Sequence, residues 1–358
     1  MKKLLKRFAL LLLCLLAALC ACTPLPEPPA PLLTPKPTEE LITPTPAPEA
    51  TEMVETEPPE EMSEAPATAE PTPEATEELP PPTPELTEAP AHEYGTLSQK
   101  SITIPSRGVE VPATVCVPAS SNGSVPLVVL SHGFRGSRDV NGGFTALSGA
   151  LLDAGVASIR VDFAGCGQST EDFSACSLTT MTQDVLAAVD YMLANYNIDP
   201  GRIGLLGYSL GGRVSLELVA DGRLAPHAML LIAPAASTAD FKKLLGGESA
   251  WASLRQKAEQ NGYAELGGVR LGLRFFEDMD RRESPAAAAA ANFGGRAGVV
   301  YSTNDGAVSP SVSKGVADAL GCEPLVFSTG GHAYGLQSDP TNPLLSQIIA
   351  LAVSLFAG

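Results

Sequence analysis

A serine flanked by glycines is the feature of this sequence with the clearest chemical potential. It lies in Gly207-Tyr208-Ser209-Leu210-Gly211, which matches the pattern G-x-S-x-G. The apolar run 203–206 before the motif predicts a strand, and residues 211–221 after it predict a helix. A sharp strand-to-helix turn would expose the Ser209 hydroxyl at the carboxyl end of a sheet and point the helix N-terminus towards it. This context favours a nucleophilic serine over an inert serine in a glycine-rich turn.

A serine hydroxyl is a weak nucleophile without a base, and three histidines are candidates for that base. His132 follows an apolar run and precedes the serine, in the place of an oxyanion loop. His227 precedes a predicted strand, which is typical of a loop or surface residue. His332 follows the last predicted strand and takes the final place in the order nucleophile, acid, base that accompanies this type of turn. We predict that His332 is the general base.

The acid that orients this base should follow a strand and lie between Ser209 and His332. Asp305 meets both conditions, because it ends the segment Val299-Val300-Tyr301-Ser302-Thr303-Asn304-Asp305. It would orient His332 and stabilise its cationic form during turnover, although aspartate is also common in turns and at helix N-termini. The other candidate aspartates lie in an irregular segment or within a predicted helix and fit less well: Asp240, Asp278, Asp280 and Asp318.

Two backbone N–H groups complete the predicted site as donors to an oxyanion. One belongs to Leu210, directly after the nucleophile, and the other to Phe134, in the loop after the first core strand. No C-x-x-C motif or His-rich spacing indicates a metal. We therefore expect neither a metal nor an organic cofactor.

Apolar runs alternate with helical patterns over residues 96–358, which we interpret as one domain. After an opening hairpin at 101–104 and 111–117, the expected strands are 126–130, 156–161, 203–206, 229–232, 297–301 and 324–327. The expected helices are 144–154, 178–196, 211–221, 311–320 and 344–356, and Asp199-Pro200 is expected to form a turn. This alternation predicts an α/β domain with a mostly parallel sheet covered by helices on both faces.

Residues 237–293 interrupt the alternation. They contain Trp251, the only tryptophan, together with helical patches. We interpret them as a small cap-like insertion over the strand ends, with a longer crossover as the alternative.

Several motifs occur in the order found in one family. They are His132-Gly133-Phe134, Arg160-Val161-Asp162-Phe163-Ala164-Gly165-Cys166-Gly167-Gln168-Ser169, the Ser209 motif, Asp305-Gly306-Ala307-Val308 and His332. From Ser101 to the C-terminus the chain resembles the α/β hydrolases grouped with serine aminopeptidases and dienelactone hydrolases, and most closely bacterial cinnamoyl and feruloyl esterases. Two positions depart from that pattern, because Ser309 stands where the acid motif usually has proline and Gly331 where the base loop commonly has aspartate.

The resemblance implies hydrolysis of small acyl or aryl esters through an acyl-enzyme, with the insertion shaping the acyl pocket. A peptidase or amidase of the same fold is the alternative, because the three site residues alone do not separate the two activities. A non-catalytic surface binding protein is a third interpretation, and the complete Ser–Asp–His set argues against it.

The first residues are typical of an export signal. A basic start at 2–7 precedes an apolar run at 8–21, which is shorter than the roughly 20 residues of a membrane-spanning helix. The run ends in Leu19-Cys20-Ala21-Cys22, which resembles the lipobox of bacterial lipoproteins. The resemblance implies removal of residues 1–21 and lipidation of Cys22; Cys20 fits less well, because a bulky leucine precedes it. We expect an extracytoplasmic protein anchored by lipid to a bacterial membrane, with an ordinary cleaved signal as the alternative.

Residues 22–95 are rich in proline, threonine and glutamate and are expected to form a disordered, extended spacer. Residues 23–93 hold 20 of the 32 prolines and 17 acidic residues against one basic residue, a net charge of −16. Glycosylation of this segment stays open. Without this segment and the basic start, the total charge of −17 becomes −5, which gives no indication of nucleic-acid binding.

Four cysteines lie in the predicted domain, at positions 116, 166, 176 and 322. Cys166 and Cys176 share one predicted loop, and an extracytoplasmic location permits a disulfide between them. Free thiols are equally compatible with the spacing.

Overall fold

The computed structural model describes residues 99–119, 123–336 and 342–358. The predicted signal segment 1–21, the lipidation site Cys22 and the spacer 22–95 lie outside the described residues. Among the described helices, none is long and apolar enough to cross a membrane.

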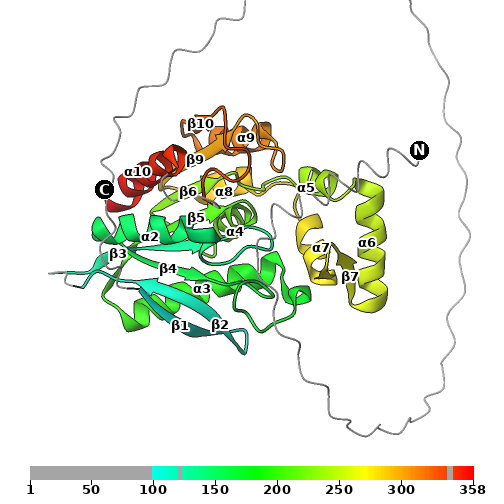
Figure 1. Cartoon of the computed structure of the whole chain (residues 1–358), viewed down its shortest axis with the longest axis horizontal. Helices are drawn as coiled ribbons and strands as arrows, with labels where there is room; N and C mark the ends of the chain where they lie inside the picture. The colour runs from blue at the N-terminus through cyan, green and yellow to red at the C-terminus, as the bar shows by residue number, and fades with distance from the viewer. Residues whose placement is uncertain (1–98, 120–122, 337–341) are drawn as a thin grey trace, which may run out of the picture. The chain divides into compact units, whose positions relative to one another are not determined.

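An eight-stranded sheet with the order β1-β2-β4-β3-β5-β6-β9-β10 forms the centre of the described region (Figure 1). β1 pairs antiparallel with β2 and β2 antiparallel with β4, whereas all later neighbours are parallel. The strands are β1 (Gln99–Ser106), β2 (Val109–Cys116), β3 (Val125–Ser131), β4 (Ala157–Val161), β5 (Ile198–Tyr208), β6 (Ala228–Ile232), β9 (Arg296–Ser302) and β10 (Leu325–Phe327). The predicted α/β class with a mostly parallel sheet is confirmed.

Five helices cover the two faces of this sheet. They are α2 (Gly143–Asp153), α3 (Leu178–Asn195), α4 (Leu210–Ala220), α9 (Pro310–Leu320) and α10 (Pro343–Ala357). Alternate residues of each strand point to opposite faces. Val128 and Leu130 of β3 therefore pack in one apolar cluster with α2 and α10, whereas Leu127 and Val129 pack in the other with α3, α4 and α9. The burial of both faces explains why the strands consist of continuous apolar runs.

The predicted turn at Asp199-Pro200 is wrong, because β5 runs without interruption from Ile198 to Tyr208. The strand accommodates these residues through a register shift against β3, between Val125 and Leu127. The Asp199 carboxylate accepts a hydrogen bond from the N–H of Gly201 at 2.9 Å within this irregular stretch. A proline is tolerated in a strand at such an irregularity, where a ladder hydrogen bond is already missing.

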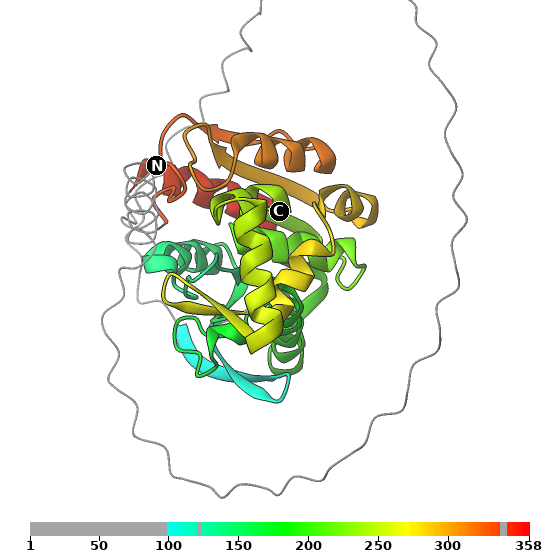
Figure 2. The ribbon, with the colours of Figure 1, turned by 90° about the vertical axis from the view of Figure 1, so that its right-hand side faces the viewer.

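The chain between β6 and β9 forms four further helices and a small hairpin. Their bounds are α5 (Thr238–Leu244), α6 (Glu248–Asn261), β7 (Tyr263–Leu266), β8 (Val269–Gly272), α7 (Leu273–Asp280) and α8 (Ala286–Asn292). Residues 238–280, here called the cap segment, form the group beside the sheet in Figure 1 and face the viewer in Figure 2. A cluster of buried aromatic rings holds this segment together: Phe241, Trp251, Phe275 and Phe276. The last helix, α8, instead packs on α4 and α9.

The four cysteines of the described region are free thiols. Cys116, Cys166 and Cys176 are buried. Burial raises the pKa of Cys176 to about 12 and also raises the pKa of Cys166. These thiols are therefore protonated near neutral pH and are poor nucleophiles.

Candidate active site

Ser209 occupies a strained turn between β5 and α4. Its backbone has φ 55° and ψ −117°, a combination that few non-glycine residues adopt. The turn is tight enough to exclude any side chain at the flanking glycines. A Cβ atom on Gly207 would lie 2.4 Å from the carbonyl oxygen of Gly211, and one on Gly211 would lie 2.0 Å from that of Ser131. The two glycines of the motif are therefore required by the backbone that carries the serine.

The structure brings the side chains of Ser209, His332 and Asp305 into one hydrogen-bonded chain. The Ser209 Oγ lies 3.0 Å from Nε2 of His332, and Nδ1 of His332 lies 2.8 Å from Oδ2 of Asp305. A carboxylate accepts hydrogen bonds, so neutral His332 carries its proton on Nδ1 and offers Nε2 to the serine hydroxyl. Ser209 lies in the β5–α4 turn, Asp305 in the loop after β9 and His332 in the loop after β10. This is the geometry of an activated nucleophile.

The Asp305 carboxylate is held on both oxygens. Oδ1 accepts hydrogen bonds from the N–H groups of Ala307 and Val308 at 2.8 and 3.0 Å, while Oδ2 accepts from His332 and from the Tyr334 hydroxyl, each at 2.8 Å. Burial opposes ionisation of this carboxyl, but the hydrogen bond and charge of His332 and the two backbone donors outweigh burial and lower the pKa of Asp305. The carboxylate is therefore ionised at neutral pH.

Two tyrosines hold the loop of His332, and neither was among the residues predicted from the sequence. Tyr208 donates a hydrogen bond from its hydroxyl to the carbonyl oxygen of His332 at 2.6 Å. Tyr334 is fully buried, and its hydroxyl accepts a hydrogen bond from the N–H of Ser302 at 3.1 Å while donating to Asp305. Burial and the Asp305 charge raise the pKa of Tyr334, so its hydroxyl keeps the proton that it donates. In the sequence, the one indication of these roles is position, because Tyr208 directly precedes Ser209 and Tyr334 follows His332 by two residues.

His132 has a structural position rather than a place beside Ser209. Its Nε2 accepts a hydrogen bond from the N–H of Phe163 at 3.2 Å, which requires the proton to sit on Nδ1, 2.8 Å from the carbonyl oxygen of Gly133. Burial lowers the pKa of His132 and favours this neutral form. His227 directly precedes β6, at the end of the strand opposite to the one beside Tyr208 and Ser209, and its Nε2 is 2.9 Å from the guanidinium of Arg296. Of these histidines, His332 is the one that contacts Ser209.

The loop after β3, which carries the predicted oxyanion donor Phe134, lies against the serine. A Cβ atom on Gly133 would lie 3.1 Å from the Cβ of Ser209. The Phe134 ring packs among Phe173, Phe241 and Phe275, with ring centroids 5.3 to 5.9 Å apart. The second predicted donor, Leu210, is the first residue of α4.

Asp162, at the end of β4, organises the same loop. Its carboxylate accepts hydrogen bonds from the backbone N–H of Arg138 at 2.7 Å and from that of Gln168 at 2.9 Å, and it also binds the Arg138 guanidinium. Both charges are buried, so each depends on the other for compensation. Within residues 99–119, 123–336 and 342–358, no group of three His, Cys, Asp or Glu side chains is placed to hold a metal ion.

The sheet order, the strained turn at Ser209 and the hydrogen-bonded Ser–His–Asp chain are together typical of hydrolases with the α/β-hydrolase fold. The protein belongs to the alpha/beta hydrolase family, whose model matches residues 128–347, more than half of the chain.

Solved structures of esterases and peptidases share this fold. Est1E from Butyrivibrio proteoclasticus, solved with ferulic acid bound, has a TM-score of 0.55 at 20% identity, covering 72% of this chain and 100% of that one. An esterase from Pyrococcus furiosus gives 0.52 at 17% identity, covering 73% of this chain and 92% of that one. The acylaminoacyl peptidase from Pyrococcus horikoshii gives 0.53 at 17% identity, covering 74% of this chain but 42% of that one. At these identities the similarity shows the fold alone.

Curated relatives match over shorter stretches. An uncharacterized 31.7 kDa protein of Escherichia coli is 36% identical over 87 residues, which cover 24% of this chain and 30% of the relative. An uncharacterized protein of Mycobacterium tuberculosis is 30% identical over 123 residues, 34% of this chain and 41% of the relative. The chain thus spans less than half the length of these relatives.

Proposed function

We propose that this protein is a serine-dependent carboxylic ester hydrolase that acts through an acyl-enzyme on small acyl or aryl esters. The observation that carries the proposal is the hydrogen-bonded chain from Ser209 through His332 to Asp305, with the serine on a strained turn at the start of a helix. The His332 side chain is 18% exposed whereas that of Asp305 is 1% exposed. The base therefore faces the solvent side, and the acid is shielded behind it.

The proposed reaction begins when His332 Nε2 accepts the proton of Ser209 as Oγ attacks the ester carbonyl. The backbone N–H groups of Phe134 and Leu210 stabilise the resulting oxyanion. His332 then gives the proton to the leaving alcohol, and Ser209 keeps the acyl group. Water, activated by the same base, releases the acid and restores the serine. Asp305 keeps Nδ1 of His332 protonated and stabilises the imidazolium throughout.

Cleavage of amide or peptide bonds is the second candidate. An acylaminoacyl peptidase is among the proteins that share this fold, and the same three residues can serve both reactions. Paired p-nitrophenyl ester and p-nitroanilide substrates with the same acyl group separate the two candidates. Anilide hydrolysis that is lost in Ser209→Ala would indicate amide cleavage, whereas ester hydrolysis without detectable anilide hydrolysis would indicate an esterase.

The serine mechanism is tested with the purified protein on short p-nitrophenyl esters. Ser209→Ala should abolish hydrolysis and labelling by a fluorophosphonate probe. Ser313→Ala is the matched control, because the buried Ser313 hydroxyl on α9 has no hydrogen-bond partner in the described region and its removal should be harmless. A wild-type protein that neither hydrolyses esters nor reacts with the probe would contradict the proposal and favour a binding protein.

We also propose that the mature protein is anchored outside a bacterial membrane by lipid on Cys22. The support is the lipobox-like sequence before Cys22 and the proline-rich segment after it. A fatty-acid analogue supplied during growth should label the wild-type protein but not Cys22→Ala. Equal labelling of the two would contradict the anchor.

A further inference from the structure

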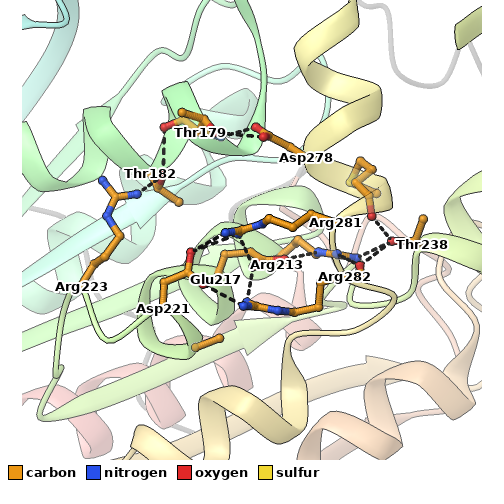
Figure 3. A network of polar contacts seen from close by, with 12 residues as sticks. Thr179, Thr182, Arg213, Glu217, Asp221, Arg223, Thr238, Asp278, Arg281 and Arg282 are labelled. Atoms are coloured by element: carbon orange, nitrogen blue, oxygen red, sulfur yellow. Dashed lines mark hydrogen bonds and ion pairs between the residues drawn. The ribbon is translucent and has the colours of Figure 1, made fainter.

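The helix that directly follows Ser209 carries a buried arginine that contacts both ends of the cap segment. Arg213 lies in the first turns of α4, and its side chain is fully buried. Figure 3 shows its guanidinium at the centre of a network of polar contacts that joins α4 to residues on either side of the cap segment.

Arg213 binds both ends of the cap segment, and its Nη1 contacts the entry and the exit together. Nη1 donates to the Thr238 hydroxyl at 3.2 Å and to the carbonyl oxygen of Glu283 at 3.3 Å, and Nη2 donates to the carbonyl oxygen of Arg282 at 2.6 Å. Thr238 is the first residue of the cap segment, whereas Arg282 and Glu283 follow its last helix. One side chain of α4 therefore holds both the entry and the exit of the cap segment.

The two ends also bind each other. The N–H of Thr238 donates to the carbonyl oxygen of Glu283 at 2.9 Å, and the Thr238 hydroxyl lies 2.8 Å from the carbonyl oxygen of Met279. Ser237 donates from its hydroxyl to the Glu283 carboxylate at 2.8 Å. The ends thus form a closed stem with Arg213 as their shared partner on α4.

Two acidic residues, Glu217 in α4 and Asp221 directly after it, compensate the positive charges of this stem. Glu217 accepts from Arg213 at 3.1 Å on one carboxylate oxygen, and from Arg281 and Arg282 at 3.0 and 2.6 Å on the other. Asp221 binds the same two arginines at 2.8 to 3.0 Å. Because the Glu217 side chain is 1% exposed, its contacts are shielded from solvent screening. They hold the exit of the cap segment against α4.

The opposite end of the cap segment reaches the loop beside Ser209. Arg135 donates from Nη1 to the carbonyl oxygen of Gly267, in the turn between β7 and β8, at 2.9 Å. Phe241 and Phe275 pack against the ring of Phe134. A shift at the stem would therefore move the aromatic wall that adjoins the proposed oxyanion loop.

We propose that Arg213 is a positioning residue that fixes the stem of the cap segment, and with it the aromatic rings packed on Phe134 beside Ser209, and thereby determines which acyl groups the enzyme accepts. This inference rests on the proposed esterase function. The cap segment acts as a fixed wall held at its stem, because the same guanidinium binds its entry and its exit.

The test compares Arg213→Met with the wild-type full chain on p-nitrophenyl acetate and p-nitrophenyl benzoate. Glu217 keeps Arg281 and Arg282 as partners in this variant, so no buried charge is left alone. We expect the ratio of kcat/KM for benzoate to that for acetate to change about tenfold, mainly through the KM of benzoate. A purely structural loss would lower kcat for both esters equally and leave their ratio unchanged.

Thr238→Val is a second variant that removes the stem hydroxyl while keeping the charges. If Arg213→Met does not fold, the ester ratio and the proteolysis rate of Thr238→Val test the inference. Arg223→Gln is the matched control, because Arg223 binds Thr182 of α3 at 2.7 Å rather than the cap segment. Trypsin should cut the cap segment, for example after Lys242 or Lys257, faster in both stem variants than in the control.

Both readouts are needed for support. An ester ratio within about twofold of wild type in both stem variants, or tryptic cleavage no faster than in Arg223→Gln, overturns the inference. Failure of the esterase proposal is distinguishable, because then the wild type shows no ester hydrolysis while the proteolysis comparison still reports on the stem.

Discussion

The hydroxyl of Tyr334 binds the same carboxylate oxygen of Asp305 that binds His332. Both contacts measure 2.8 Å, and the tyrosine side chain is buried behind the acid. The relationship extends the Ser–His–Asp chain by a fourth member that contacts neither the serine nor the solvent. It gives Asp305 a fixed orientation from which to hold His332.

Tyr334→Phe should lower kcat while KM stays near the wild-type value. The variant loses a hydrogen bond to a charged group and leaves the N–H of Ser302 unpaired, effects worth ~1.5–3 kcal/mol, or about ten- to a hundredfold in rate if fully expressed in the transition state. Steady-state kinetics well below the unfolding temperature measure the effect. Tyr191→Phe on α3 serves as the control, and equal kinetics for the two variants would show that the contact does not support the site.

Asp305→Asn should reduce kcat by about 10³–10⁴-fold, because an amide can donate to Nδ1 and so favours the wrong His332 tautomer. The variant should still fold, since its amide oxygen can accept from the N–H groups of Ala307 and Val308 as the carboxylate does. Burst-phase kinetics with p-nitrophenyl acetate measure the acylation step directly. Asp318→Asn on the exposed surface of α9 is the control. Retention of most activity in Asp305→Asn would remove this residue from the mechanism.

Gly211→Ala should prevent the native turn, since the new Cβ would lie 2.0 Å from the carbonyl oxygen of Ser131. We expect loss of soluble protein, or a lowered unfolding temperature together with loss of fluorophosphonate labelling. Gly315→Ala on α9 is the matched control, because outside the adjacent backbone of its own helix no heavy atom lies within 4 Å of its Cβ position. Since alanine is the better helix former, that change should stabilise α9 by about 0.8–1 kcal/mol. A Gly211→Ala protein as stable as wild type would contradict the tight turn.

His132 should make the protein less stable in mild acid. Burial lowers the pKa of His132, so below the ordinary histidine pKa of about 6.5 the unfolded chain binds a proton that the folded chain does not. The free energy of unfolding therefore decreases as pH falls from about 7 towards the lowered pKa, by at most ~1.4 kcal/mol per pH unit for this one group.

Urea unfolding at several pH values measures this dependence. His132→Gln should be less stable at pH 7 but should lack most of the decrease between about pH 7 and pH 5. His227→Gln is the control. Burial and the Arg296 charge also lower the pKa of His227, but that side chain is only partly buried. The control should keep most of the decrease, and an unchanged slope in His132→Gln would refute the assignment.

Much of the fold was predictable because it follows from local patterns. The apolar strands on both sides of Ser209 and the amphipathic helices between them lie where the sequence predicts them. The continuation of β5 through Asp199-Pro200 was not predictable from residue preference, because pairing with β3 extends the strand through a proline that usually ends one. The partners of Arg213 were equally hidden. An arginine four residues before a glutamate on a helix is typical of a solvent-exposed ion pair, yet both side chains are buried here under the stem of the cap segment.

The sequence by itself determined the alternation of strands and helices, the glycines around Ser209 and the order in which Ser209, Asp305 and His332 follow their strands. These features depend on neighbours in the chain. The spacing of apolar residues, which repeats every two residues in strands and every 3.6 residues in helices, can be counted directly along the sequence. Only the tertiary structure decided that Tyr334 lies behind Asp305, that Tyr208 holds the His332 loop and that Arg213 holds the cap segment. The partners in these contacts are 29, 124 and 69 residues apart in the chain. The first two pairs meet because the parallel strands bring their carboxyl ends to one edge of the sheet, and the third meets because the stem of the cap segment packs on α4.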